Sequence, residues 1–306
     1  MRAPLFNITG LLLGITMLYS QGSVGQENQP FSDTISFHLT DHNNLSVQAV
    51  INQRDTVDLM FHTAAGDVTL ISEVIGDLPS LVWQEPQAVH SWGGANEARV
   101  SVNNEMHIGR IQTDSLTIWE TQRSGPKTDG KFGPDFFGGR IFEMNYDDEV
   151  LRVYSALPTQ MEGYQKLPLV IENGLMFIEA TARVGKKEYT HRFLIHSGYG
   201  GTLLFDDAFA QESQLGEQIV ITDQQELKDS YGNVIKTQKG LLPSFKLGDL
   251  EFQNLPVGFF EGALGRQKVS VLGGDLLKRL NLIFDLENET IYIAASHWKG
   301  TPHSGS

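Results

Sequence analysis

Alternation of apolar and polar residues dominates the chain and predicts a protein built mainly from β-strands. Val47, Ala49 and Ile51 alternate with polar neighbours, as in a strand with one buried face. Two further apolar runs, 57–61 and 193–195, lead directly into turns of small residues. We therefore expect an all-β fold.

A hairpin and one short helix stand out within this pattern. Gly248 and Asp249 separate two short apolar segments within 245–252, which predicts a β-hairpin. Helical signals are sparse elsewhere. The best candidate is a helix of about two turns over 276–280, with Asp275 as its N-cap.

The second half of the chain repeats the order of signals in the first half. Residues 91–93 (Ser-Trp-Gly) recur as 230–232 (Ser-Tyr-Gly), and 132–135 (Phe-Gly-Pro-Asp) recur as 272–275 (Leu-Gly-Gly-Asp). Because several matches keep both order and nearly constant spacing, they indicate an internal duplication rather than chance similarity between hairpins. The polar stretch 157–163, which contains proline and glycine, separates the two halves.

The two ends of the chain differ from the patterned part. Met1 and Arg2 precede a short apolar run at 11–18 and then small residues, which is the pattern of a secretory signal. The run is shorter than the ~20 residues that span a bilayer. We expect a signal peptide at 1–25, an N-terminal lobe at 26–157, a C-terminal lobe at 158–296 and a flexible tail at 297–306.

Composition and net charge exclude several kinds of ligand and of chemistry. The 306 residues are 40% hydrophobic and 20% charged, which suits a folded domain with a core. The formal net charge of -14 argues against nucleic acid or an anionic membrane as a partner, and mildly favours basic or neutral ligands. The absence of cysteine excludes disulfides, thiol catalysis and cysteine-ligated metals. We expect a periplasmic or secreted monomer without a cofactor.

Each half also contains an apolar strand that ends in a short turn, followed later by an apolar pair, a glycine and a short helix. The turns are 61–64 (Phe-His-Thr-Ala) and 195–198 (Ile-His-Ser-Gly). The later segments are 271–273 (Val-Leu-Gly) and 131–133 (Lys-Phe-Gly), which is imperfect because Lys131 stands at its first apolar position. This plan resembles the two-lobed aspartic peptidases, pepsin-like and retropepsin-like, over roughly residues 35 to 295. The resemblance implies two duplicated β-barrel-like halves with a peptide-binding cleft between them.

One departure from that family pattern concerns the catalytic groups. The resemblance places His62 and His196 where the family has its two catalytic aspartates. Two carboxylates about 3 Å apart share one proton, so that one acts as a base and the other as an acid. Two imidazoles carry a charge of zero or plus one, and they are bulkier. We therefore expect the ordinary aspartic mechanism to be absent.

The neighbouring turn residues keep more of the family pattern. Thr63 and Ser197 match the hydroxyl positions that link the two turns by hydrogen bonds, and Gly198 matches the family glycine. Ala64 stands at the other glycine position, where we expect its Cβ to strain the backbone.

Four nearby carboxylates could in principle replace the missing pair. They lie outside both turns, and we therefore expect none of them to reach the histidines: Asp58, Asp67, Asp206 and Asp207.

The resemblance also suggests which residues contact a peptide. Trp92 and Gly93 fall where the family has a hairpin that folds over its substrate, and Tyr231 and Gly232 are their counterparts in the second half. A bound peptide would lie extended between the lobes and pair through its backbone.

Three functions remain open for the histidine pair. The favoured one is peptide binding without cleavage. The second is hydrolysis by a non-standard pair in which one imidazole is neutral and the other protonated near pH 6.5. The third is zinc or copper binding through two imidazoles, although zinc usually takes three or four protein ligands and only His90 could add another.

Overall fold

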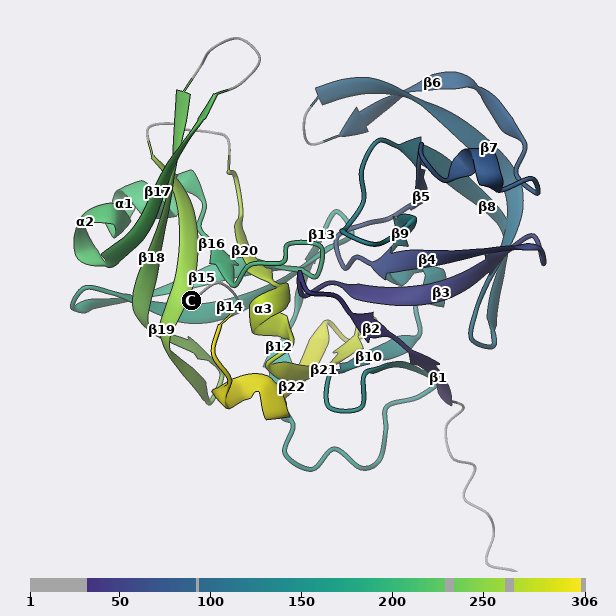
Figure 1. The fold of residues 1–306 in the computed structure, drawn as a ribbon. Helices are drawn as coiled ribbons and strands as arrows, with labels where there is room; N and C mark the ends of the chain where they lie inside the picture. Colours follow the sequence, from purple (N-terminus) through teal and green to yellow (C-terminus); the bar gives the residue numbers. More distant parts are fainter. Residues whose placement is uncertain (1–31, 92–93, 229–233, 262–266, 304–306) are drawn as a thin grey trace, which may run out of the picture.

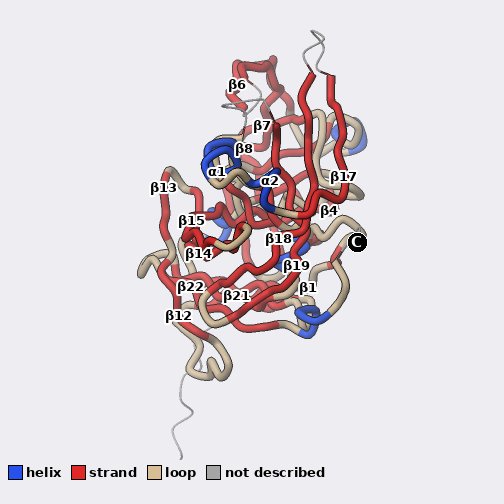
Figure 2. The backbone as a smooth tube through the Cα atoms, turned by 90° about the vertical axis from the view of Figure 1, so that its left-hand side faces the viewer, coloured by secondary structure: helices blue, strands red, loops and turns tan. Residues whose placement is uncertain are grey.

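The computed structural model of the chain describes residues 32–91, 94–228, 234–261 and 267–303. Two lobes lie side by side above a third sheet (Figure 1). Strands make up most of the regular structure (Figure 2). The predicted all-β fold is therefore confirmed.

The sheet of the first lobe closes on itself. Its strand β3 pairs with β4 along one edge and also with β7, where Val50 faces His107. The order of strands in this sheet is β2 (His38–Leu39), β3 (Leu45–Ile51), β4 (Asp55–Phe61), β9 (Gly130–Phe132), β5 (Val68–Ile71), β8 (Ile111–Thr121), β7 (Gly94–Ile108) and β6 (Trp83–Ser91).

The sheet of the second lobe repeats this arrangement, including the extra pairing between β14 and β18. Its order is β13 (Val170–Glu172), β14 (Leu175–Val184), β15 (Lys187–His196), β20 (Ser270–Gly273), β16 (Leu203–Leu204), β19 (Leu250–Glu261), β18 (Val234–Leu247) and β17 (Val220–Lys228). Because β4 corresponds to β15 and β9 to β20, with the same parallel pairing in both lobes, the topology agrees with the predicted duplication.

A third sheet joins the two halves. Strands β10 and β21 pair across the junction, and Phe142 stacks on Phe284 with ring centroids 4.5 Å apart. The order of this sheet is β1 (Ser32–Ser36), β11 (Val150–Tyr154), β10 (Ile141–Asn145), β21 (Leu280–Asp285), β22 (Thr290–Ala295) and β12 (Gln165–Pro168). Both halves therefore contribute strands to one continuous layer (Figure 1).

Alternation along the strands decides which side chains enter the core. In β3 the side chains of Leu45, Val47, Ala49 and Ile51 are buried, whereas Gln48 is exposed. Each fully buried leucine or isoleucine contributes about 1.5–3 kcal/mol. The pattern that predicted the strands thus also identifies the faces on which the lobes pack.

The predicted hairpin at 245–252 is present. Leu247 faces Leu250 across the turn between β18 and β19, and Gly248 has a φ of 57°. This left-handed backbone is favourable for glycine and costly for other residues.

The helices are short and differ from the sequence prediction in one respect. The helix near Asp275 begins at Gly274, so Asp275 lies inside the helix and the prediction that it is the N-cap is wrong. Its carboxylate accepts a hydrogen bond from Thr202 and pairs with Lys278 instead. The described helices are η1 (Ile75–Asp77), η2 (Pro134–Phe137), α1 (Asp207–Glu212), α2 (Leu215–Gln218), α3 (Gly274–Leu277) and η3 (His297–Gly300).

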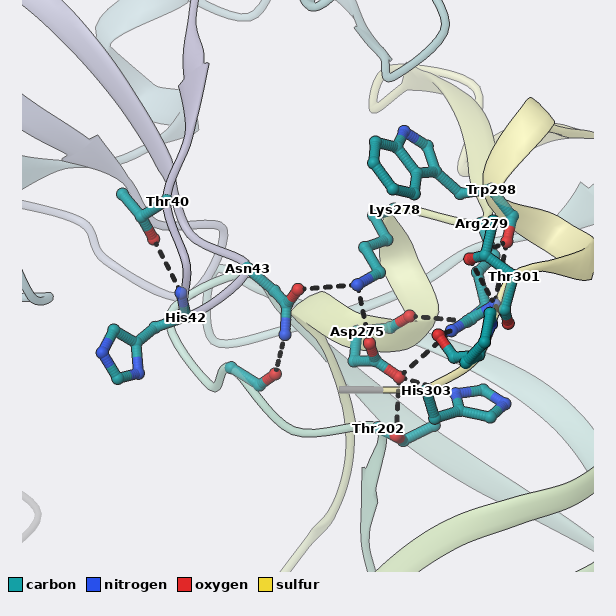
Figure 3. A network of polar contacts seen from close by, with 12 residues as sticks. Thr40, His42, Asn43, Thr202, Asp275, Lys278, Arg279, Trp298, Thr301 and His303 are labelled. Atoms are coloured by element: carbon teal, nitrogen blue, oxygen red, sulfur yellow. Dashed lines mark hydrogen bonds and ion pairs between the residues drawn. The ribbon is translucent and has the colours of Figure 1, made fainter. Parts of the chain in front are cut away.

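The structure describes the first part of the predicted C-terminal tail, residues 297–303. Residues 297–303 continue as η3 and an extended stretch, held by the buried guanidinium of Arg279 (Figure 3). That group donates to the carbonyl oxygens of Trp298, Thr301 and Pro302 at 2.8, 2.8 and 3.0 Å. Because a buried guanidinium needs several acceptors, it orders a segment whose composition alone suggests a loose end.

Candidate functional site

The site is built where two equivalent strand pairs end. Strand β4 runs parallel to β9, and β15 runs parallel to β20. A Cβ on Gly133 would overlap the carbonyl oxygen of Ala65, and one on Gly273 would overlap that of Gly201. Because only glycine permits this approach, each strand-end turn packs directly against the segment behind it.

Thr63 and Ser197 connect the two turns. The backbone N–H of each residue donates to the hydroxyl of the other at 3.0 Å. Each hydroxyl in turn donates to a carbonyl of the opposite lobe at 2.7 Å, Thr63 to Ile195 and Ser197 to Phe61. Both side chains are buried. The lobes are thus held together at the base of the site by groups that are independent of the histidines.

His62 and His196 face each other at this junction. Their ring centroids lie 4.5 Å apart, with the ring planes inclined by 64°. In both turns the histidine carbonyl accepts a backbone hydrogen bond three residues on, from Ala65 at 3.0 Å and from Tyr199 at 3.1 Å. The two imidazoles therefore occupy equivalent positions and are in direct contact.

The two turns differ at the position after the hydroxyl residue. A Cβ on Gly198 would overlap Cδ2 and Nε2 of His62 and would lie 3.2 Å from Cε1 of His196. On the other side, the backbone N–H of Ala64 donates to Nδ1 of His62 at 3.1 Å. Ala64 is not among the described residues with a positive φ, so the strain expected there is absent.

Burial and nearby basic groups keep both imidazoles neutral. Desolvation, the neighbouring His196 and the charge of Lys131 together lower the pKa of His62 to about 3. The pKa of His196 is lowered as well, mainly by burial and then by Lys131. Because Nδ1 of His62 accepts a hydrogen bond, its proton belongs on Nε2. Two uncharged rings thus face each other at the junction of the lobes.

Lys131 is a member of the site that the sequence did not reveal. It appeared only as an imperfect first position of the segment 131–133, where the second lobe has the buried Val271. Desolvation lowers the pKa of Lys131, and its charge reaches both imidazoles. In the part of the chain that the structure describes, Lys131 forms no ion pair.

The candidate replacement carboxylates are engaged elsewhere or exposed, as expected. Asp206 caps α1 through a 2.8 Å hydrogen bond from the N–H of Phe209 and contacts His191. Asp207 accepts from the N–H of Gln267 at 3.1 Å. The two candidates in the first lobe, Asp58 and Asp67, are exposed to solvent. Among the described residues, no carboxylate contributes to the pKa of His62 or His196.

The other predicted contact residues lie outside the described residues, namely Trp92, Gly93, Tyr231 and Gly232. The same holds for the predicted signal peptide, 1–25. Strands β6 and β7 lead to the first pair and β17 and β18 to the second, so the two hairpins are equivalent in the topology.

Within the described residues there is no group of three or more potential ligands that could hold a metal ion.

Comparison with known proteins relates the chain to one class by fold. No family model matches the sequence, and no curated protein matches it. Among solved structures, the aspartic proteinase from Irpex lacteus superposes with a TM-score of 0.60 at 13% identity, covering 89% of this chain and 99% of that one. The chain therefore has the two-lobed fold of the aspartic proteinases.

A membrane-spanning helix is not found in the described part of the chain, where no helix is both long and apolar enough.

Proposed function

We propose that this chain is an exported protein that binds an extended peptide between its lobes and does not cleave it. The observation that carries the proposal is the contact between His62 and His196, whose ring centroids lie 4.5 Å apart. The sequence resemblance assigns these two residues to the positions of the family's catalytic pair. The aspartic-proteinase fold supports the location of the ligand, and the chemistry of the two rings supports the lack of cleavage.

The chemistry argues against hydrolysis by the ordinary route. An aspartic pair works because two carboxylates share one proton, which provides a base for the water and an acid for the substrate carbonyl. With a pKa of about 3 for His62, the imidazole pair would take up an additional proton only near pH 3 or below. Even then its charge would be positive, so it would repel the proton that the base must accept.

The way in which a peptide would bind follows from the fold. An extended peptide pairs through its backbone and places alternate side chains in pockets on either side. Trp92, Gly93, Tyr231 and Gly232 are the residues that we propose to contact it; in the sequence they fall between β6 and β7 and between β17 and β18, strand pairs that are equivalent in the topology. The Thr63–Ser197 hydrogen bonds keep the floor of the site rigid, which lowers the entropic cost of binding.

Export rests on the N-terminal sequence. The charged start at Arg2, the apolar run 11–18 and the small residues after it are typical of a secretory signal, and a cysteine-free chain suits a bacterial periplasm.

The test combines binding and cleavage in one set of samples. The mature chain is incubated with a mixed peptide library from pH 3 to pH 8, alongside His62→Ala, His196→Ala and the control His38→Ala, which changes an exposed histidine. We expect peptides to be retained on the immobilised protein and recovered intact. Cleavage that both site variants lose and the control retains would replace the proposal with a histidine-dependent hydrolase.

The same protein preparation also tests the metal-binding alternative. Elemental analysis after mild purification should detect less than about a tenth of an equivalent of zinc or copper. An equivalent of metal that His62→Ala abolishes would favour the metal-binding alternative.

A further inference from the structure

The backbone places Lys131 directly behind the turn that carries His62. Lys131 lies opposite Met60 in the parallel pairing of β4 and β9. The next residue, Phe132, accepts a hydrogen bond at its carbonyl from the N–H of His62 at 2.9 Å. The lysine therefore belongs to the same local structure as the histidine pair, and its charge acts on both rings.

The side chains of Lys131, His62 and His196 form a basic group that contains no carboxylate. The chain has 37 acidic and 23 basic residues, so an average site would contain more carboxylates than ammonium groups. Among the described residues, neither Lys131 nor either imidazole pairs with a carboxylate. A partly buried ammonium without a partner is unfavourable, because burial removes water that the protein does not replace.

The imidazoles also have unused hydrogen-bonding capacity. Nδ1 of His196 is buried without a hydrogen-bond partner among the described residues. Nε2 of His62 carries the proton, because Nδ1 accepts from Ala64 at 3.1 Å. The site thus offers a cationic group and at least one N–H donor, a combination that suits an anionic acceptor with two oxygens.

We propose that Lys131, His62 and His196 bind a carboxylate of the peptide ligand, supplied by an acidic side chain or by a free C-terminus. This inference rests on the proposed function, since it names the chemical class of the bound peptide. It also reverses the expectation from the net charge of -14, which favoured basic or neutral ligands. At contact distance the nearby ammonium outweighs the remote surface carboxylates, which solvent and salt screen.

The experiment compares matched peptides. The probes are fluorescently labelled, acetylated hexapeptides from a positional library, each made with Glu or Gln at one central position and with a free or amidated C-terminus. Their dissociation constants are measured by anisotropy with the wild type, Lys131→Met and Lys131→Arg. Lys186→Met is the control, because it removes the same charge from an exposed turn. Circular dichroism checks that every variant is folded.

We expect the wild type to prefer a carboxylate over the matching amide by about tenfold or more. Lys131→Met should bring that ratio close to one, whereas Lys131→Arg and Lys186→Met should retain it. A preference that follows the central Glu identifies a side-chain carboxylate, and one that follows the free end identifies a C-terminal carboxylate.

Three results separate this inference from the proposed function. Equal binding of acid and amide peptides by the wild type would overturn the carboxylate site and leave peptide binding intact. If no hexapeptide binds, but acetate shifts the ring resonances of His62 and His196 in the wild type and not in Lys131→Met, the carboxylate site stands and peptide binding fails. If no peptide binds and acetate does not shift the ring resonances, both proposals are overturned.

Discussion

Thr63 and Ser197 join the lobes through reciprocal hydrogen bonds although they lie 134 residues apart in the chain. Each hydroxyl accepts from the other residue's N–H and donates to a carbonyl of the opposite lobe. Neither side chain needs an aspartate beside it to make these bonds. The two lobes are therefore joined at this junction by hydroxyl groups, independently of the neighbouring histidines.

Removing one of these hydroxyls should destabilise the protein strongly. Ser197→Ala removes the acceptor of the buried Thr63 N–H and a donor to the carbonyl of Phe61, which should cost about 2–4 kcal/mol in the free energy of unfolding. Chemical denaturation measures the change, with the exposed Ser155→Ala as control. A cost below about 0.5 kcal/mol would show that the hydroxyl bonds do not hold the lobes together.

Gly198 should tolerate a side chain only when His62 is small. Gly198→Ala places a Cβ against Cδ2 and Nε2 of His62, so we expect a loss of about 1–3 kcal/mol. The loss should shrink when the same change is made in His62→Ala, a coupling that a double-mutant cycle measures. Gly76→Ala is the control, because a Cβ at Gly76 has nothing within 4 Å. Additive effects would mean that the ring does not pack on Gly198.

The protein should lose stability as the pH falls below the ordinary pKa of histidine. The pKa of His62 drops from 6.5 in the unfolded chain to about 3 in the folded one, and that of His196 drops too. Between these values only the unfolded state takes up the proton, so the contribution of His62 to stability declines by up to about 1.4 kcal/mol per pH unit.

Denaturation between pH 7 and pH 5 measures this effect above the range where most carboxylates titrate. His62→Gln should flatten the slope, and His38→Gln, at an exposed position, should leave it unchanged. An identical slope in His62→Gln would contradict the neutral, buried imidazole.

The C-terminal segment should depend on Arg279. Replacing it in Arg279→Met removes the donor that holds the carbonyls of Trp298, Thr301 and Pro302, and it leaves Asp275 with one cation fewer. We expect a loss of about 3–5 kcal/mol, because a buried charge loses its partner.

Limited proteolysis with intact mass measurement reports on the same interaction. Cleavage after residue 296 should be faster in Arg279→Met than in the wild type or in Lys186→Met, which alters an exposed lysine. Equal rates of cleavage would show that other contacts hold the segment.

Restoring the two aspartates should produce weak cleavage that improves when Lys131 is removed. In His62→Asp with His196→Asp, the ammonium of Lys131 would stabilise both carboxylates in their charged form and lower the pH at which they share a proton. Adding Lys131→Val, which copies Val271 of the second lobe, should raise peptide cleavage at pH 4–5 by about tenfold. Equal cleavage with and without Lys131 would contradict its electrostatic role.

Much of the fold could be predicted from local patterns. Alternation identified strands such as Leu45–Ile51, and the Gly248 turn predicted a hairpin that is present. The repeated order of motifs predicted a duplication, and the two lobes have the same strand order. The helix start at Gly274 was missed, because Asp275 is a good capping residue in isolation and its carboxylate is used by Thr202, Lys278 and Arg279 instead.

The sequence by itself determined the strands, the duplication and the identity of the residues at the two turns, since these follow from periodicity and from short motifs. Only the tertiary structure decided that the rings of His62 and His196 touch, that Lys131 stands behind them without a carboxylate, and that Arg279 orders the last residues. Burial and charge at a site depend on segments distant in the chain, and local sequence patterns contain no information about which of those segments meet.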